Sequence, residues 1–280
     1  MEEKKSFFDN LDPKSALIAG LIFGVLLIGT IGFVVMLVTN YSGKAGANVQ
    51  AKVDDTAAVA NNQQDATPPA TAVTKTDRPK AELFVMSYCP YGLLMEKAFL
   101  PAWELLKNKA DFSIKFVSYA MHGLKELEEN TRQYCLAKNF SAKFIPYLKC
   151  FTGKDDYKAC LTEAGVSESS LASCVNDTNK KFGILDKYND QSTWLSGRFP
   201  QYPVNADLNQ TYGVQGSPTL ILNGVEVSSA RTPEAVKQLI CSGFVSPPAE
   251  CSQTLSAAAV GPGFGNTAAA SGGANAGCGT

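Results

Sequence analysis

The chain has 280 residues and a mass of 29.8 kDa, with 45% hydrophobic residues, 18% charged residues and a formal net charge of −1. This composition excludes collagen-like, coiled-coil and wholly disordered chains, and a pI near 5.9 gives no support for nucleic-acid binding, which needs a basic face. Eight cysteines favour an oxidising compartment, and the single histidine excludes a metal site built from several histidines of one chain.

The N-terminal part of the chain predicts a membrane anchor. Residues 1–14 are polar, and residues 15–38 contain no charged side chain. A helix needs about 20 apolar residues to cross a bilayer, whereas the apolar core of a cleaved signal peptide has about 7–15. We therefore predict a transmembrane helix over 15–38. Lysines before the span favour a cytoplasmic N-terminus and an extracytoplasmic folded domain, whether periplasmic, extracellular or luminal.

Composition divides the rest of the chain into three parts. Residues 39–79 are rich in small and polar residues and predict a disordered linker, since they cannot bury enough apolar surface to fold. Residues 80–252 form the one folded domain, and residues 253–280 predict a disordered Gly/Ala-rich tail that carries Cys278. Within the membrane span, Gly20 and Gly24 form a GxxxG pair, a candidate contact for a homodimer.

The folded domain begins with a pattern typical of a β-α-β unit. An apolar run at 81–87 predicts a buried strand, helical spacing follows from Pro90, and residues 112–119 alternate as a second strand. A right-handed crossover makes these two strands parallel neighbours. Residues 123–190 predict several helices, one of them capped by Ser167.

The second half of the domain predicts a hairpin followed by a helix. Asn223-Gly224 joins the strands 219–222 and 225–227, and Thr232 caps a helix that stops near Gly243. The whole order is β-α-β, a helical insertion, then β-β-α. We therefore predict an α/β thioredoxin-like fold with a helical insertion.

A Cys-Pro-Tyr-Gly sequence, residues Cys89, Pro90, Tyr91 and Gly92, lies where the first strand passes into the first helix. A helix N-terminus stabilises a thiolate, so we expect a lowered pKa and a nucleophilic Cys89. The alternative is a buried structural cysteine. Tyr91 shapes substrate access or simply covers the helix end.

Ser217, Pro218 and Thr219 precede and start a strand in the second half. In thioredoxin folds a proline at this place is cis and lies against the active cysteine, so the resemblance implies a cis bond here. The backbone edge beside it would then pair with an extended substrate segment.

A further motif resembles the gamma-interferon-inducible lysosomal thiol reductase (GILT) family, whose signature reads C-Q-H-G-x2-E-C-x2-N-x4-C. The similarity covers roughly residues 81–252, with a DsbA-like cis-proline segment, and five signature positions match in register: His122, Gly123, Glu126, Asn130 and Cys135. Ala120 and Leu127 replace the other two signature cysteines. His122 has two readings, a general base or pH switch and a residue that orients the signature turn with Gly123.

The catalytic motif of that family is C-x-x-C, but the fourth position here is Gly92. Cys89 therefore lacks the neighbouring cysteine that would release it from a mixed disulfide. Three outcomes stay open. Cys89 acts as a monothiol, swapping disulfides or using a small external thiol; a distant cysteine such as Cys278 resolves it; or catalysis is lost.

The other cysteines are expected to form structural disulfides. Six can pair in 15 ways, and they are Cys135, Cys150, Cys160, Cys174, Cys241 and Cys251. Cys241 with Cys251 is the best single pair, because the two flank the last helix and its turn. No C-x2-C spacing typical of zinc sites occurs, so we expect no metal and no cofactor.

These features give two functional hypotheses. The first is a membrane-anchored, extracytoplasmic thiol–disulfide oxidoreductase or isomerase with Cys89 as its only motif nucleophile. Its partners would be disulfide-containing proteins or small thiols. The alternative, favoured by Gly92, is a redox-inactive binding module or chaperone at the membrane.

Overall fold

The computed structural model describes residues 73–265 and 277–279. The predicted membrane span 15–38, its Gly20/Gly24 pair and most of the predicted linker lie outside these residues. Within the part described, no helix is both long enough and apolar enough to cross a membrane. The elements are β1 (Lys80–Val85), α2 (Pro90–Leu106), β2 (Asp111–Phe116), α3 (Leu124–Asn139), α4 (Ser141–Lys154), α5 (Tyr157–Ala164), α6 (Glu168–Phe182), α7 (Ile184–Asn189), α8 (Ala206–Tyr212), β3 (Thr219–Leu222), β4 (Val225–Val227) and α9 (Pro233–Ser242).

The described strands form one sheet in the order β2-β1-β3-β4. β1 runs parallel to β2, while β3 is antiparallel to both β1 and β4. In the register, Leu83 lies between Ile114 on β2 and Leu220 on β3. The predicted β-α-β and β-β-α units are both present, and they join through β1 and β3 into a thioredoxin-like sheet.

Both faces of β1 are covered, so every residue from Ala81 to Val85 is buried. Leu83 and Val85 face the larger core, which also contains residues of α2 and α9. Phe84 and Met86 face the opposite side, where the Tyr212 ring of α8 meets Phe84 edge-on with centroids 6.0 Å apart. The segment that follows β1 and leads to Cys89 therefore starts from a strand that is packed on both sides.

The β3–β4 hairpin is confirmed at its predicted position. Asn223 and Gly224 have φ values of 50° and 85°, as a two-residue hairpin turn of primed type requires. The last helix also starts as predicted, since the Thr232 hydroxyl accepts from Ala235 N at 3.2 Å.

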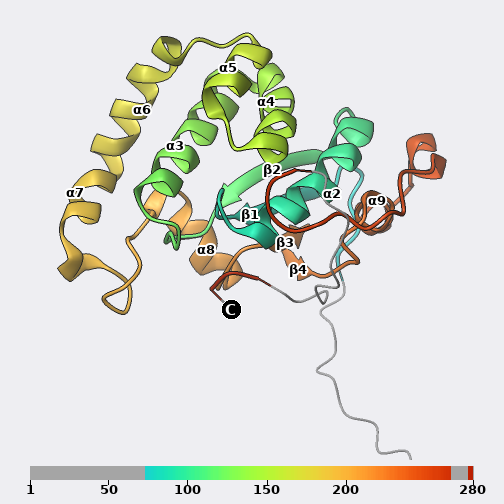
Figure 1. Ribbon diagram of the computed structural model, residues 1–280. Coiled ribbons are helices and arrows are strands. Elements are labelled where there is room, and N and C mark those ends of the chain that lie inside the picture. Colours follow the sequence, from blue (N-terminus) through green and yellow to red (C-terminus); the bar gives the residue numbers. More distant parts are fainter. Residues whose placement is uncertain (1–72, 266–276, 280) are drawn as a thin grey trace, which may run out of the picture. The chain divides into compact units, whose positions relative to one another are not determined.

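The insertion between β2 and β3 is mostly helical, and in Figure 1 helices α3–α7 form one group on one side of the sheet. Two disulfides link helices within it: Cys135–Cys174 joins α3 to α6, and Cys150–Cys160 joins α4 to α5. The expected Cys241–Cys251 bridge is also present and ties α9 to the segment after it. These bridges use the six cysteines that the sequence assigns to structural roles.

The prediction of a disordered tail from residue 253 is wrong for residues 253–265. The Lys97 ammonium of α2 donates to the carbonyl oxygens of Gly261, Gly263 and Gly265 at 2.7, 2.8 and 2.7 Å. The Phe264 ring packs edge-on against Phe151, with centroids 5.3 Å apart. The low-complexity composition gave no sign of the two aromatic contacts of Phe264 or of the backbone carbonyls that the partly buried Lys97 binds.

Glu96 of α2 is fully buried, and neither of its carboxyl oxygens has a hydrogen-bond partner among the described residues. Burial, together with the nearby charge of Glu129, raises the pKa of Glu96 to about 8. The folded protein therefore keeps Glu96 protonated at a pH where the unfolded chain ionises it.

This difference predicts a pH-dependent stability. As pH rises from the ordinary glutamate range of about 4.3 toward 8, the unfolded chain loses its Glu96 proton first, so the free energy of unfolding should fall. Glu96→Gln has nearly the same shape but no titratable carboxyl group, so the free energy of unfolding of this variant should fall less with pH. Urea unfolding at pH 5 and pH 8 gives the free energy of unfolding of both proteins. An equal decrease between the two pH values in wild type and variant would contradict the assignment.

Candidate active site at the start of helix α2

Cys89 is the N-cap of α2, directly after the loop that leaves β1. Its Sγ accepts a hydrogen bond from Gly92 N at 3.4 Å, and Pro90 occupies the first helical position, where no N–H is needed. The first turn of this 17-residue helix contains no acidic residue. A thiolate at Cys89 would therefore face helix N–H groups and the positive end of the helix dipole.

The loop before β3 lies against this cysteine. The Ser217–Pro218 bond is cis, as the resemblance implied. Ser217 O lies 3.4 Å from Cys89 Sγ, and the Ser217 hydroxyl accepts from Met86 N at 2.9 Å. Thr219 instead turns inward, where its hydroxyl donates to Gly216 O at 2.9 Å and closes the loop. Of the three predicted substrate-binding residues, Ser217 thus contacts the cysteine, Pro218 follows it through the cis bond, and Thr219 supports the loop.

Gly92 leaves no room for a side chain in this arrangement. A Cβ placed on Gly92 would lie 2.7 Å from Ser217 Oγ and 3.1 Å from Met86 O. The second cysteine of a C-x-x-C motif would need this same Cβ position. The packing at Gly92 is therefore consistent with the lack of a second cysteine in the motif.

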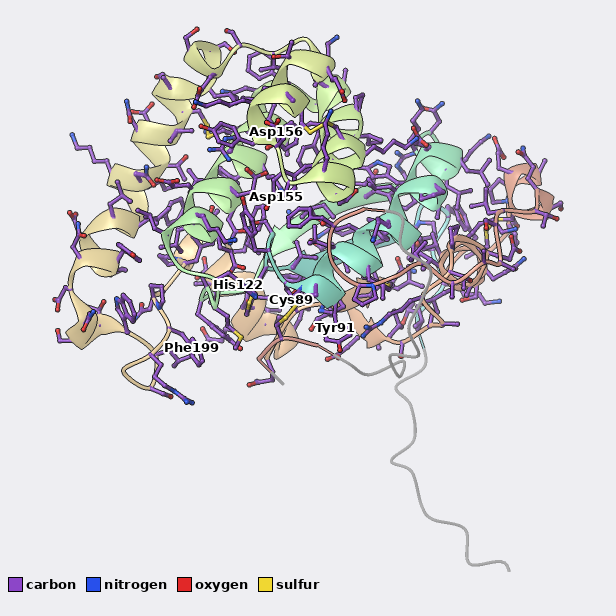
Figure 2. All side chains as sticks on the ribbon, viewed as in Figure 1. Cys89, Tyr91, His122, Asp155, Asp156 and Phe199 are labelled. Carbon is purple, nitrogen blue, oxygen red and sulfur yellow. A yellow bond between two sulfur atoms is a disulfide. The ribbon has the colours of Figure 1, made fainter. Side chains whose placement is uncertain are left out.

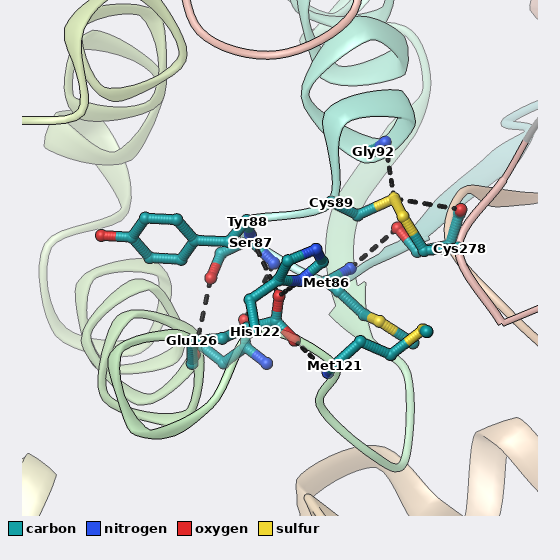
Figure 3. Close-up of polar contacts among 11 residues, drawn as sticks. Met86, Ser87, Tyr88, Cys89, Gly92, Met121, His122, Glu126 and Cys278 are labelled. Atoms are coloured by element: carbon teal, nitrogen blue, oxygen red, sulfur yellow. Dashed lines mark hydrogen bonds and ion pairs between the residues drawn. A yellow bond between two sulfur atoms is a disulfide. The ribbon is translucent and has the colours of Figure 1, made fainter. Parts of the chain in front are cut away.

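The signature residues of α3 hold the loop that precedes Cys89 (Figure 3). Asn130 Oδ1 accepts from Ser87 N at 3.1 Å, and Glu126 Oε2 accepts from Tyr88 N at 3.3 Å. Glu126 also accepts from Met121 N at 2.9 Å and contacts His122 Nδ1. The signature thus fixes the backbone of the two residues before the nucleophile.

Two further signature residues have structural roles. Gly123 begins α3 with φ 75° and ψ −159°, a backbone conformation that side chains other than glycine rarely adopt. Cys135 is part of the Cys135–Cys174 bridge. His122 binds the carboxylate that positions Tyr88, which matches the orienting role rather than a contact with the sulfur.

Tyr91 lies at the same end of the molecule as Cys89 and His122 (Figure 2). The Arg231 guanidinium lies over its ring, 5.7 Å from the centroid. Tyr91 also packs against the core cluster that contains Cys89. The ring therefore covers the start of the helix beside the nucleophile.

Cys278 completes the site, although no local motif marks it. It is disulfide-bonded to Cys89 across 189 residues of sequence. In the sequence, this pair was indicated only by the cysteine count, since six structural cysteines out of eight leave Cys89 and Cys278. In the described residues, no group of three or more His, Cys, Asp or Glu side chains could hold a metal ion.

Comparison with known proteins finds similarity only to solved structures. The reduced form of the disulfide bond oxidoreductase DsbG from Mycobacterium tuberculosis aligns over 64% of this chain and 88% of its own, with 18% identity and a TM-score of 0.43. Oxidised BdbD from Bacillus subtilis aligns over 61% of this chain and 90% of its own, with 16% identity and a TM-score of 0.43. DsbA from Pseudomonas aeruginosa aligns over 62% and 87%, with 15% identity and a TM-score of 0.37. No protein-family model and no curated protein sequence matches the chain.

The contact between Gly92 and Ser217 predicts a coupled pair of substitutions. Gly92→Ala should destabilise the protein by about 1 kcal/mol or more, because overpacking costs roughly 1–3 kcal/mol and exceeds the helix propensity gained, at most about 1 kcal/mol. In a Ser217→Ala background the hydroxyl is gone, so the same change should cost less. Denaturant unfolding of the four proteins gives the coupling energy; additive effects would mean that the two residues do not compete for space.

Proposed function

We propose that this protein is a thiol–disulfide oxidoreductase or isomerase in which Cys89 is the only nucleophile of its motif. The observation that carries the proposal is the position of Cys89 Sγ. It accepts from Gly92 N at the start of α2 and lies 3.4 Å from Ser217 O in the cis-proline loop. The sulfur thus has helix N–H groups on one side and, on the other, the backbone of the cis-proline loop, whose Ser217 N and O pair with Cys278 in this structure.

The first side supplies the nucleophile. Helix N–H groups and the helix dipole favour the thiolate over the thiol, so the pKa of a reduced Cys89 is expected to fall below the free value of about 8.5. The thiolate attacks one sulfur of a substrate disulfide. A new bond then joins Cys89 to that sulfur, and the second substrate sulfur leaves as a thiolate.

The second side supplies the substrate contact. Ser217 N and O belong to the loop beside Cys89, and both can pair with an extended chain in the manner of strand addition. Such pairing reads backbone rather than side chains, so it suits disulfide-containing proteins of varied sequence. Small thiols and disulfides would use the same sulfur without the backbone contacts.

We further propose that the domain acts outside the cytoplasm, attached to the membrane by residues 15–38, with a cytoplasmic N-terminus and self-association through Gly20 and Gly24. The charge-free run supports the anchor. The disulfides Cys135–Cys174, Cys150–Cys160 and Cys241–Cys251 support an oxidising compartment. The matched signature of His122, Gly123, Glu126 and Asn130 supports a GILT-like origin for the domain.

The test isolates Cys89 by replacing Cys278 with serine. In this Cys278→Ser protein, alkylation by iodoacetamide across pH should give a Cys89 pKa below about 7.5, within the range seen at helix N-termini. Glutathione disulfide should form a mixed disulfide at Cys89, identified by peptide mass spectrometry. The matched control is the Cys89→Ser/Cys278→Ser protein, which should form none.

The competing reading is a redox-inactive binding module, which Gly92 favours because the motif lacks its second cysteine. It predicts that Cys89 titrates like a free thiol and that both variants trap equal, background amounts of glutathione. That pair of results would replace the enzymatic proposal.

A further inference from the structure

The segment around Cys278, residues 277–279, lies along the cis-proline loop and pairs with it at one position. Cys278 N donates to Ser217 O at 2.7 Å, and Ser217 N donates to Cys278 O at 2.9 Å. These two bonds form an antiparallel bridge, and the Cys89–Cys278 disulfide lies beside it. The segment therefore uses the backbone groups that we assign to the substrate strand.

The fit of this segment depends on a glycine after the cysteine. Gly279 has φ 83°, and its carbonyl oxygen lies 3.2 Å from the Tyr119 hydroxyl. A Cβ on Gly279 would lie 1.8 Å from Tyr119 Oη. The Cys-Gly sequence thus matches a surface formed by Ser217 and Tyr119.

A second contact keeps the preceding chain close to the active site. Gly263 N donates to Pro90 O at 2.8 Å, and Pro90 is adjacent to Cys89. Lys97 binds three carbonyls of the same stretch, Gly261, Gly263 and Gly265. Residues 261–265, which we call the Lys97-bound loop, are therefore held against α2, whose first residue follows Cys89.

We infer that Cys278 is the resolving cysteine of this enzyme, which makes Cys89 and Cys278 a redox couple whose second member lies outside the motif. The inference rests on the proposed function of Cys89. Its own support is the strand pairing at Ser217, the glycine fit at Tyr119 and the Lys97-bound loop. Gly92 further supports a second cysteine outside the motif, since Ser217 Oγ fills the space that a cysteine at position 92 would need.

The reaction balances in two exchanges. Cys89 thiolate attacks the substrate disulfide, joins one sulfur and releases the other as a thiolate. Cys278 thiolate then attacks Cys89 Sγ, forms the Cys89–Cys278 bond and releases the remaining substrate sulfur. The substrate gains two electrons and becomes a dithiol, while the enzyme becomes the disulfide. An external dithiol returns the enzyme to its reduced form; the same steps in reverse oxidise a substrate dithiol.

The experiment follows one adduct in the full chain. Reduced wild-type protein and the Cys278→Ser variant are mixed with glutathione disulfide, and glutathione on Cys89 is followed by mass spectrometry with excess reagent removed. In wild type the adduct should disappear as the Cys89–Cys278 peptide pair appears. In the Cys278→Ser variant it should persist at least about 10-fold longer, because no thiol of high effective concentration can displace it.

Two variants that keep both cysteines test the geometry. Gly279→Ala should slow closure of the Cys89–Cys278 bond, because its Cβ collides with Tyr119. Lys97→Met should slow closure about 3- to 10-fold by releasing the loop and lowering the effective concentration of Cys278. Lys107→Met, at an exposed lysine at the end of the same helix, should close at the wild-type rate.

The outcomes separate the two proposals. Equal adduct lifetimes in wild type and Cys278→Ser would overturn the role of Cys278 while leaving Cys89 a nucleophile. Failure of the Cys278→Ser variant to form any adduct would overturn the proposed function itself. Closure at equal rates in wild type, Gly279→Ala and Lys97→Met would reject the strand pairing and the loop as the means of delivery.

Discussion

The position of the nucleophile depends on one buried carboxylate, that of Glu126. It accepts from Tyr88 N beside Cys89 and from Met121 N beyond β2, and it contacts His122 one turn before it. The loop before Cys89, which is distant in sequence, and the segment just before α3 are thereby both tied to α3. A buried carboxylate is tolerated only when donors surround it, so the segment that ends at Cys89 and the segment before α3 must keep their backbone N–H groups aimed at the same point. The order of the site follows from this requirement.

Around that fixed point, the packing of Ser217 disfavours a second cysteine at position 92 and accommodates Cys278. On the helix side, Ser217 Oγ fills the space above Gly92 while it binds Met86 N. On the side of the cis-proline loop, Ser217 N and O point away from β1 and pair with the segment of Cys278. The side chain of Ser217 thus fills the space that a cysteine at position 92 would need, while its backbone binds the segment that carries Cys278.

The sequence predicted what local patterns specify. The strand pair around Asn223-Gly224, the N-cap at Thr232 and the cysteine at the start of α2 depend on neighbours a few residues away. The order of the elements and the Cys241–Cys251 bridge were also predicted from patterns of this local kind, and the spacing of His122 to Asn130 was read in the same way. The contacts of Lys97 did not, because carbonyls of glycines more than 160 positions later carry no side-chain pattern. The Cys89–Cys278 pairing was likewise open in the sequence, since it depends on a strand contact across the fold.

The Tyr119–Gly279 contact has a consequence for selectivity. A substrate strand that pairs with Ser217 in the register of Cys278 places the residue after its reacting cysteine against the Tyr119 hydroxyl, where the chain itself carries glycine. Larger residues at that position would have to displace the ring or shift the strand. In the proposed function, Tyr119 would therefore restrict the size of the side chain that follows the reacting cysteine, whereas Ser217 would contact only backbone. Disulfides flanked by small residues would be the ones this surface accepts most readily.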